Sequence, residues 1–107
     1  MAYKVKWTKK AKEQRKDLFR YGYKVWGIAQ TKSFWAALCL KMRMLGDAPY
    51  ACAKEMLLEN FLPEARSMVL HPNYKVVYLI DESTESIYII GFWDTRKEPQ
   101  KNVKATI

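Results

Sequence analysis

The chain has 107 residues, which fits one domain with a single hydrophobic core. Half of its residues are apolar or aromatic, so the composition excludes an intrinsically disordered protein. Lys and Arg outnumber Asp and Glu by 19 to 11, and the net charge of +8 favours an anionic partner, either nucleic acid or an acidic protein segment.

The N-terminal region predicts a strand followed by a long helix. Residues 3–7 alternate apolar and basic side chains, which is typical of a half-buried strand. Thr8 is a suitable N-cap, and residues 9–28 have the apolar spacing of a helix. The buried face of this helix is expected to carry Ala11, Leu18, Gly22, Val25 and Ala29.

A second helix is predicted from about residue 32 to about residue 45. Gly27 and the pair Gln30-Thr31 indicate the break before it, while Gly46 and Pro49 are typical of a helix C-terminus. Its apolar face is expected to carry Phe34, Trp35, Leu38, Met42 and Leu45. Because the joining turn is short, the two helices should form an antiparallel hairpin.

The C-terminal half changes to strand character. Residues 53–61 have one apolar side and are compatible with a short helix. Three β-rich runs follow at residues 66–70, 74–80 and 87–93, separated by segments of turn composition. The last two runs are apolar on both faces, which predicts a central place in the sheet. A basic C-terminal tail covers about residues 95–107, and its part after Pro99 is expected to fray unless a partner orders it.

These elements predict an α+β fold in a single domain over residues 1–107. The order is an N-terminal strand, a two-helix hairpin and an antiparallel three-stranded meander, or β-α-α-β-β-β. The hairpin must bury its apolar stripe against one face of the sheet. The first strand is expected at the sheet edge, with its lysines toward solvent.

Several classes of protein and site are excluded. The N-terminal segment has lysines in place of the apolar run of a signal peptide, and no stretch approaches the roughly 18 apolar residues of a membrane span, so we expect a cytoplasmic protein without membrane contact. Cys39 and Cys52 lack metal-ligand spacing and only one histidine is present, so no metal and no cofactor are expected. Cys39 falls in an apolar helical pattern and is expected to be buried.

Several motifs occur in a characteristic order along nearly the whole chain. The strand at 3–7 leads into the basic segment 8–12 and the helical hairpin. Arg66 opens the meander, the tyrosine-rich run 73–78 follows, and an apolar strand leads into Asp94-Thr95-Arg96. In this order and spacing the chain resembles the RelE/ParE superfamily of toxins from bacterial type II toxin–antitoxin systems.

The resemblance implies a small twisted antiparallel sheet carrying two N-terminal helices, and one of two activities. RelE-like members cleave mRNA, usually on the ribosome, whereas ParE-like members bind and poison DNA gyrase. In both branches an antitoxin encoded next door neutralises the toxin, so we expect a tight complex with a small acidic antitoxin. A homodimer of the isolated toxin is left open.

Metal-independent RNA cleavage needs a base for the 2′-hydroxyl, a cation for the crowded phosphate and an acid for the leaving 5′-oxygen. By the resemblance, Arg66 stands where RelE-like members carry a phosphate-stabilising Arg, and Arg96 matches the Arg of a C-terminal His-x-Arg pattern. The alternative for each arginine is a surface ion pair. Asp94 stands where many relatives have His, and it would need a raised pKa to donate a proton; its alternative is to pair with and orient Arg96 or Arg66.

The general base is not identified by the sequence. His71 lies beside Pro72 in a turn and is expected to be structural. The remaining candidates for the base are Glu59, Glu64, Lys75 and Tyr78.

Four side chains are candidate RNA contacts. Lys75 is either a phosphate contact or a solvent-facing residue, and Trp93 either closes the core or stacks on an unpaired base. Lys97 and Lys101 belong to the basic tail. The lysines of the two helices form either a solvated face or an electrostatic footprint for phosphates.

The sequence is compatible with three functions. The first expectation is a RelE-like mRNA interferase, an endoribonuclease that inhibits translation and has RNA and the ribosome as partners. The second is a ParE-like inhibitor of DNA gyrase that acts by binding, which Asp94 and the missing base favour. The third is a catalytically inactive member that binds only antitoxin and DNA.

Overall fold

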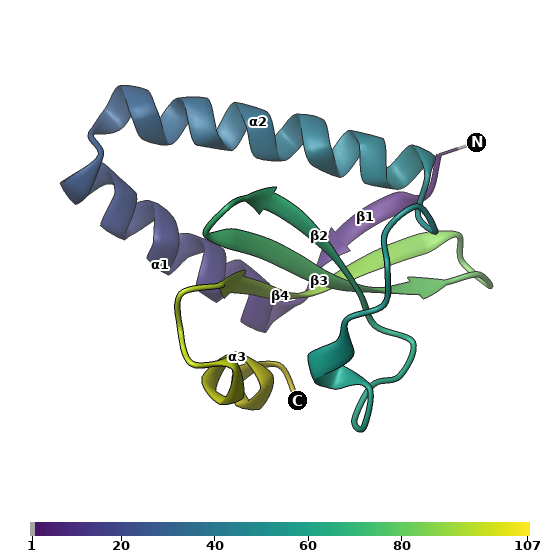
Figure 1. The fold of residues 1–107 in the computed structure, drawn as a ribbon. Coiled ribbons are helices and arrows are strands. Elements are labelled where there is room, and N and C mark those ends of the chain that lie inside the picture. Colours follow the sequence, from purple (N-terminus) through teal and green to yellow (C-terminus); the bar gives the residue numbers. More distant parts are fainter. Residues whose placement is uncertain (1) are drawn as a thin grey trace.

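The computed structural model describes residues 2–107, and its elements follow the predicted order with one helix added (Figure 1). In chain order they are β1 (Lys4–Trp7), α1 (Lys9–Val25), α2 (Ile28–Asp47), the 3-10 turn η1 (Met56–Leu58), β2 (Arg66–His71), β3 (Tyr74–Asp81), β4 (Ser86–Asp94) and α3 (Pro99–Thr106). The expected α+β class and the β-α-α-β-β-β order are confirmed, and α3 is the addition.

The strands form one sheet in the order β1-β4-β3-β2. β3 pairs antiparallel with β2 and β4, whereas β1 lies parallel to β4 with Val5 opposite Ile87. β3 and β4 therefore occupy the centre, as their two apolar faces predicted, and β1 is an edge strand. Beyond the end of β1, the Gln14 side chain of α1 accepts a hydrogen bond from the Phe92 N–H at 2.7 Å, so α1 covers this part of the β4 edge.

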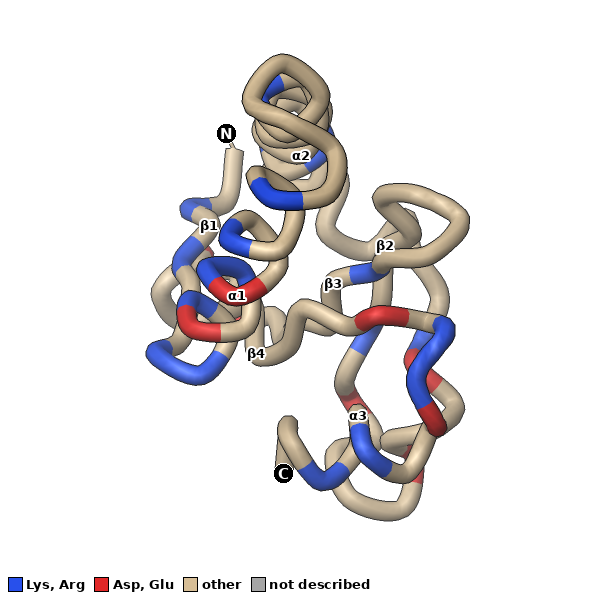
Figure 2. Tube along the Cα trace, turned by 90° about the vertical axis from the view of Figure 1, so that its left-hand side faces the viewer, with Lys and Arg blue, Asp and Glu red and all other residues tan. Residues whose placement is uncertain are grey.

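The helical hairpin forms as predicted, but its break lies earlier. Thr8 is the N-cap of α1 and accepts a hydrogen bond from the Ala11 N–H at 3.3 Å. Gly27 has φ +86°, a conformation that favours glycine, and α2 begins at the next residue. Lys and Arg residues gather along α1 (Figure 2).

Gly46 has a different role from the predicted C-terminal glycine. It lies inside α2, which continues to Asp47. The Tyr3 N–H donates to the Gly46 carbonyl at 2.8 Å, and a Cβ at this position would meet the Tyr3 carbonyl oxygen at 2.9 Å. Glycine is needed here because the N-terminal segment crosses directly against the helix backbone.

Two apolar clusters lie on opposite faces of the sheet. The larger cluster lies between the sheet and the hairpin and includes the buried residues Ala11, Leu38, Met42, Leu45, Tyr74, Val76, Tyr78, Ile87, Ile89 and Phe92. The smaller cluster joins the other face to η1 and α3, and its buried members are Leu58, Ala65, Val77, Trp93 and Val103. Figure 1 shows α3 on the side of the sheet away from the hairpin.

The expectation that the C-terminal tail frays is wrong. Pro99 occupies the first turn of α3, and Val103 is buried against the sheet. The Trp93 Nε1–H donates to Thr106 Oγ1 at 2.8 Å, and Asn102 Nδ2 donates to the Asp94 carbonyl at 3.0 Å. One apolar anchor, Val103, and two part-buried hydrogen bonds hold this mostly polar helix on the sheet.

Smaller details of the prediction also differ. Val25 and Ala29 are exposed and do not belong to the core stripe. Val25 is the last residue of α1, and Ala29 lies beyond the break at Gly27, in α2. Cys39 is exposed on α2 and is not buried. Within 53–61 only the single turn η1 is helical. Among residues 2–107, no helix combines the length and apolar character that a bilayer crossing demands.

Candidate functional site

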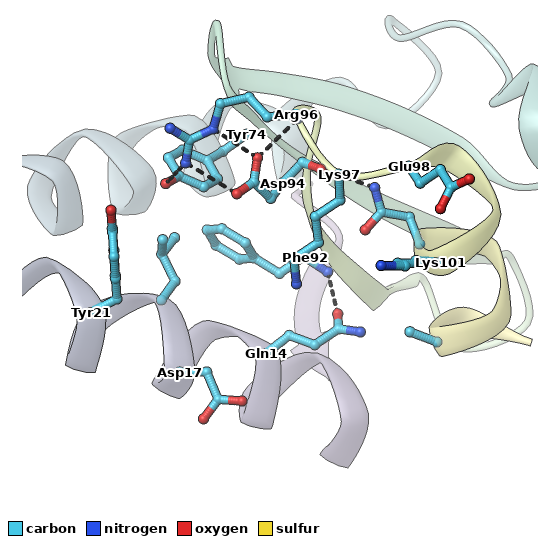
Figure 3. A pocket seen from close by; sticks show the side chains of 13 residues that line it. Gln14, Asp17, Tyr21, Tyr74, Phe92, Asp94, Arg96, Lys97, Glu98 and Lys101 are labelled. Carbon is cyan, nitrogen blue, oxygen red and sulfur yellow. Dashed lines mark hydrogen bonds and ion pairs between the residues drawn. The ribbon is translucent and has the colours of Figure 1, made fainter.

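A cleft of about 770 Å³ lies between α1, the end of β4 and α3 (Figure 3). It brings together residues that are far apart in the sequence. Its polar lining comes from Gln14, Asp17, Tyr21, Tyr74, Asp94, Arg96, Lys97, Glu98, Lys101 and Asn102. Four of the predicted site residues therefore line this cleft, namely Asp94, Arg96, Lys97 and Lys101.

Arg96 is the centre of this cleft and is held by two partners. Its Nε and Nη2 donate to the two carboxylate oxygens of Asp94, each at 3.1 Å, and the Arg96 N–H donates to Asp94 Oδ1 at 2.9 Å. Nη2 also donates to the Tyr74 hydroxyl at 2.9 Å. The expected pairing of Asp94 with Arg96 is present, and its two-pronged geometry fixes the plane of the guanidinium.

The two partners of Arg96, Asp94 and Tyr74, both have shifted pKa values. Burial alone would raise the pKa of Asp94, but the hydrogen bonds and charge of Arg96 lower it below its usual value. Burial raises the pKa of Tyr74, although Arg96 opposes this shift. The shifted pKa values keep the Asp94 carboxylate charged and the Tyr74 hydroxyl protonated, and the hydrogen bonds of Asp94 orient the Arg96 guanidinium.

Lys97 and Lys101 are both exposed at the rim of the cleft. The carboxylates of Asp17 and Glu98 line the same space, so the cleft carries mixed charge. An exposed mixture of this kind does not by itself concentrate phosphate groups.

Arg66 lies outside this cleft, at the start of β2. Its Nη1 donates to the Cys52 carbonyl at 2.6 Å, and its guanidinium lies 5.2 Å from the centre of the Tyr50 ring. Arg66 of β2 lies opposite Tyr78 of the neighbouring strand β3, whereas Arg96 donates a hydrogen bond to Tyr74 of β3. The two anchor points on β3 are four residues apart, or about 13 Å along a strand. The structure therefore does not unite the two arginines in one site.

Lys75 and Trp93 lie on the opposite face of the sheet from the hairpin. Lys75 forms an ion pair with Glu55, and its Nζ lies 5.2 Å from the centre of the Trp93 ring. Trp93 is only 1% exposed and packs with Val77 and Val103. Trp93 closes the core, so it offers no free face to a base, and Lys75 is neutralised inside the protein.

The candidate bases are engaged or remote. Burial raises the pKa of Tyr78 above its usual value, and its hydroxyl donates to the Pro49 carbonyl at 2.7 Å. Glu64 pairs with Lys54 at 3.5 Å, and Glu59 is exposed. None of these carboxylates lines the cleft around Arg96.

His71 ends β2, where its Nδ1 accepts a hydrogen bond from the Asn73 N–H at 3.1 Å. Its ring packs beside those of Phe34 and Tyr74. Within residues 2–107, no three His, Cys, Asp or Glu side chains are grouped to hold a metal ion.

Sequence reasoning missed Tyr74, Tyr21 and Gln14 as lining residues. Tyr74 is directly opposite Asp94 in the β3–β4 pair, so the register of this hairpin would have revealed it. Gln14 and Tyr21 come from α1, and only the packing of the helix on β4 brings them there.

Comparisons with known proteins now identify the fold and family. The structure resembles that of a chain from the chromosomal ParDE toxin–antitoxin system of P. aeruginosa, with a TM-score of 0.69 and 14% identity over 87% of this chain and 96% of the other. It also resembles a double Arg-to-Ala variant of the E. coli toxin RelE in the free state, with a TM-score of 0.60 and 20% identity over 100% of both chains.

No curated protein is significantly similar in sequence. The model of the family described as ParE toxin of type II toxin–antitoxin system, parDE, matches residues 5–99. The expected membership of the RelE/ParE superfamily is confirmed. The chain belongs to the ParE toxin family of type II toxin–antitoxin systems, and a toxin of this class has a cognate antitoxin as its partner.

Proposed function

We propose that this toxin arrests growth by binding to DNA gyrase, as ParE-like toxins do, and not by cleaving mRNA. The observation that carries this proposal is the internal neutralisation of the expected catalytic cation: Arg96 has both carboxylate oxygens of Asp94 within hydrogen-bond distance. A phosphate approaching Arg96 would meet the negative charge of Asp94 at the same time.

The other candidate cations support the same conclusion. Lys75 is paired with Glu55 on the far face of the sheet, and Arg66 donates to a backbone carbonyl. RNA cleavage would need one of these cations and a base to meet at one phosphate. Their separate positions favour a toxin whose surface, and not a reactive centre, performs the function.

An mRNA interferase is the second candidate, and one observation favours it. Tyr74, Arg96, Lys97 and Lys101 line the same cleft (Figure 3). They would form a phosphate cradle if Asp94 turned away from Arg96. In that case RNA and the ribosome would be the target, and Tyr74 would be near the reacting phosphate.

Induction of the toxin in cells that lack its antitoxin separates the candidates. We expect growth arrest with induction of the SOS response and no new 5′ ends in the transcript pool. New 5′ ends within minutes, without an SOS response, would refute the gyrase proposal. Harmless overexpression of folded protein would instead support the inactive member.

A pair of variants sharpens the experiment. Arg66→Ala should retain growth arrest, because Arg66 is turned toward the Cys52 carbonyl, and exposed Arg43→Ala on α2 is the matched control. If circular dichroism shows that both variants fold and only Arg66→Ala is inactive, Arg66 acts on the target and the interferase becomes the better proposal.

A further inference from the structure

A second cleft, of about 730 Å³, is lined by residues of both helices of the hairpin, α1 and α2. We call it the hairpin groove. It shares no lining residue with the cleft around Arg96. Five of its lining side chains are cations, namely Lys12, Arg15, Lys16, Arg20 and Lys32, and no carboxylate lines it. Figure 2 is viewed from the side of the turn that joins α1 and α2 and shows Lys and Arg in blue along the trace of α1.

The helical period explains this separation of charge. Lys12, Lys16 and Arg20 succeed one another at intervals of four residues, so they lie along one face of α1. The acidic residues Glu13 and Asp17 fall on the neighbouring face. Asp17 does reach Arg20 at 3.4 Å, but both side chains are mostly exposed, so this pair is weak.

Aromatic rings are interleaved with these cations. Trp35 is 41% exposed and Tyr23 is 51% exposed, and both line the groove. The guanidinium of Arg15 lies 4.5 Å from the centre of the Trp7 ring and 5.3 Å from that of Trp35. Phe19 packs edge-on against Trp35 at 5.3 Å. The cation and the rings are therefore held in place before any ligand arrives.

We propose that the hairpin groove binds single-stranded nucleic acid. Lys16 and Lys32 would contact phosphates, and the exposed rings of Tyr23 and Trp35 would stack on unpaired bases. The carboxylates of an acidic protein segment would pair with the cations, but they would not provide flat rings to stack on Tyr23 and Trp35. The binding does not depend on whether gyrase or RNA is the toxin's target.

The first test measures fluorescence anisotropy of labelled 12-nucleotide oligodeoxythymidylate and oligouridylate with the purified toxin over a range of salt. We expect Lys16→Glu/Lys32→Glu to weaken binding by about tenfold or more and to reduce the log–log salt slope by about 1.4, because two phosphate contacts are lost. Comparing the two oligonucleotides shows whether DNA or RNA is preferred.

The control is Arg43→Glu/Lys104→Glu, which changes two exposed residues outside the groove. Both double variants carry the same net charge, since two reversals lower +8 by four to +4. The control should bind within about threefold of the parent protein. An equal loss in both variants would show that only the overall field of the protein attracts nucleic acid, and would overturn the proposal.

The second test examines stacking on Trp35. Trp35→Ala should weaken oligonucleotide binding by about fivefold or more, and Trp35→Phe should recover most of it. Circular dichroism checks that each variant folds. If Trp35→Ala binds like the parent, no base stacks on Trp35 and the proposal fails. If oligoglutamate of equal charge competes as well as the oligonucleotide, the groove is a docking surface for acidic protein, and the proposal fails as well.

Discussion

The ion pair between Lys75 and Glu55 offers the sharpest test of how this fold uses its cations. Glu55 is 6% exposed, and its Oε1 has no hydrogen-bond donor apart from the Lys75 ammonium. Lys75→Met keeps the length of the side chain and leaves the carboxylate buried without its partner. Removing one member of a buried pair costs about 3 kcal/mol, and the melting temperature should fall by about 12 °C.

The pKa of Glu55 determines how the stability of the parent and of Lys75→Met changes with pH. Burial tends to raise the pKa of Glu55, but Lys75 and the Leu57 N–H lower it below its ordinary value of 4.5. The pair therefore stabilises the parent protein above pH 4.5, and this contribution is lost as the pH falls through the lowered pKa. In Lys75→Met burial becomes the main influence and raises the pKa of Glu55, so the variant should lose stability as the pH rises.

Urea denaturation at pH 4 and pH 7 measures both effects, with Lys97→Met as a control at an exposed lysine. Glu55→Gln/Lys75→Met should be closer to the parent than Lys75→Met alone, because no unpaired charge remains. A loss below about 1 kcal/mol for Lys75→Met, with unchanged pH dependence, would refute the reasoning and return Lys75 to the candidate phosphate contacts.

Three further predictions concern the Arg96 cleft and the cores. Asp94→Asn should cost about 1 kcal/mol, measured by urea denaturation, because the pair with Arg96 is partly exposed; a loss above about 3 kcal/mol would contradict this. Gly91→Ala places a Cβ 2.6 Å from Trp93 Nε1, so hydrogen exchange of the α3 amides should accelerate, and unchanged protection would refute that contact. Tyr78→Phe should cost about 1 kcal/mol by losing a buried hydrogen bond, and a neutral result would show that the bond contributes nothing.

The sheet and the hairpin could be predicted because local patterns determine them. The runs that form β3 and β4 are apolar on both faces, which only a central strand satisfies. The helix break was misplaced because Gln30-Thr31 has the composition of a turn, whereas the positive φ of Gly27 ends the first helix. Thr31 instead donates from its hydroxyl to the Gly27 carbonyl at 2.8 Å inside the new helix.

Long-range contacts account for what the sequence did not predict. α3 depends on Trp93, whose Nε1–H meets Thr106 only after the chain has folded. Likewise, Glu55 was overlooked because its segment has no clear periodicity, and it is the contact with Lys75 that makes it structural. The pairing of Asp94 with Arg96 was foreseen because two residues of spacing bring the side chains together locally.

The most direct measurement is a supercoiling assay with purified DNA gyrase and the purified toxin, run beside a reconstituted translation reaction that reports mRNA cleavage. The toxin should block supercoiling and accumulate gyrase-dependent cleaved DNA, with the mRNA intact. Normal supercoiling together with toxin-dependent cuts in ribosome-bound mRNA would contradict the binding mechanism and assign the Arg96 cleft to RNA.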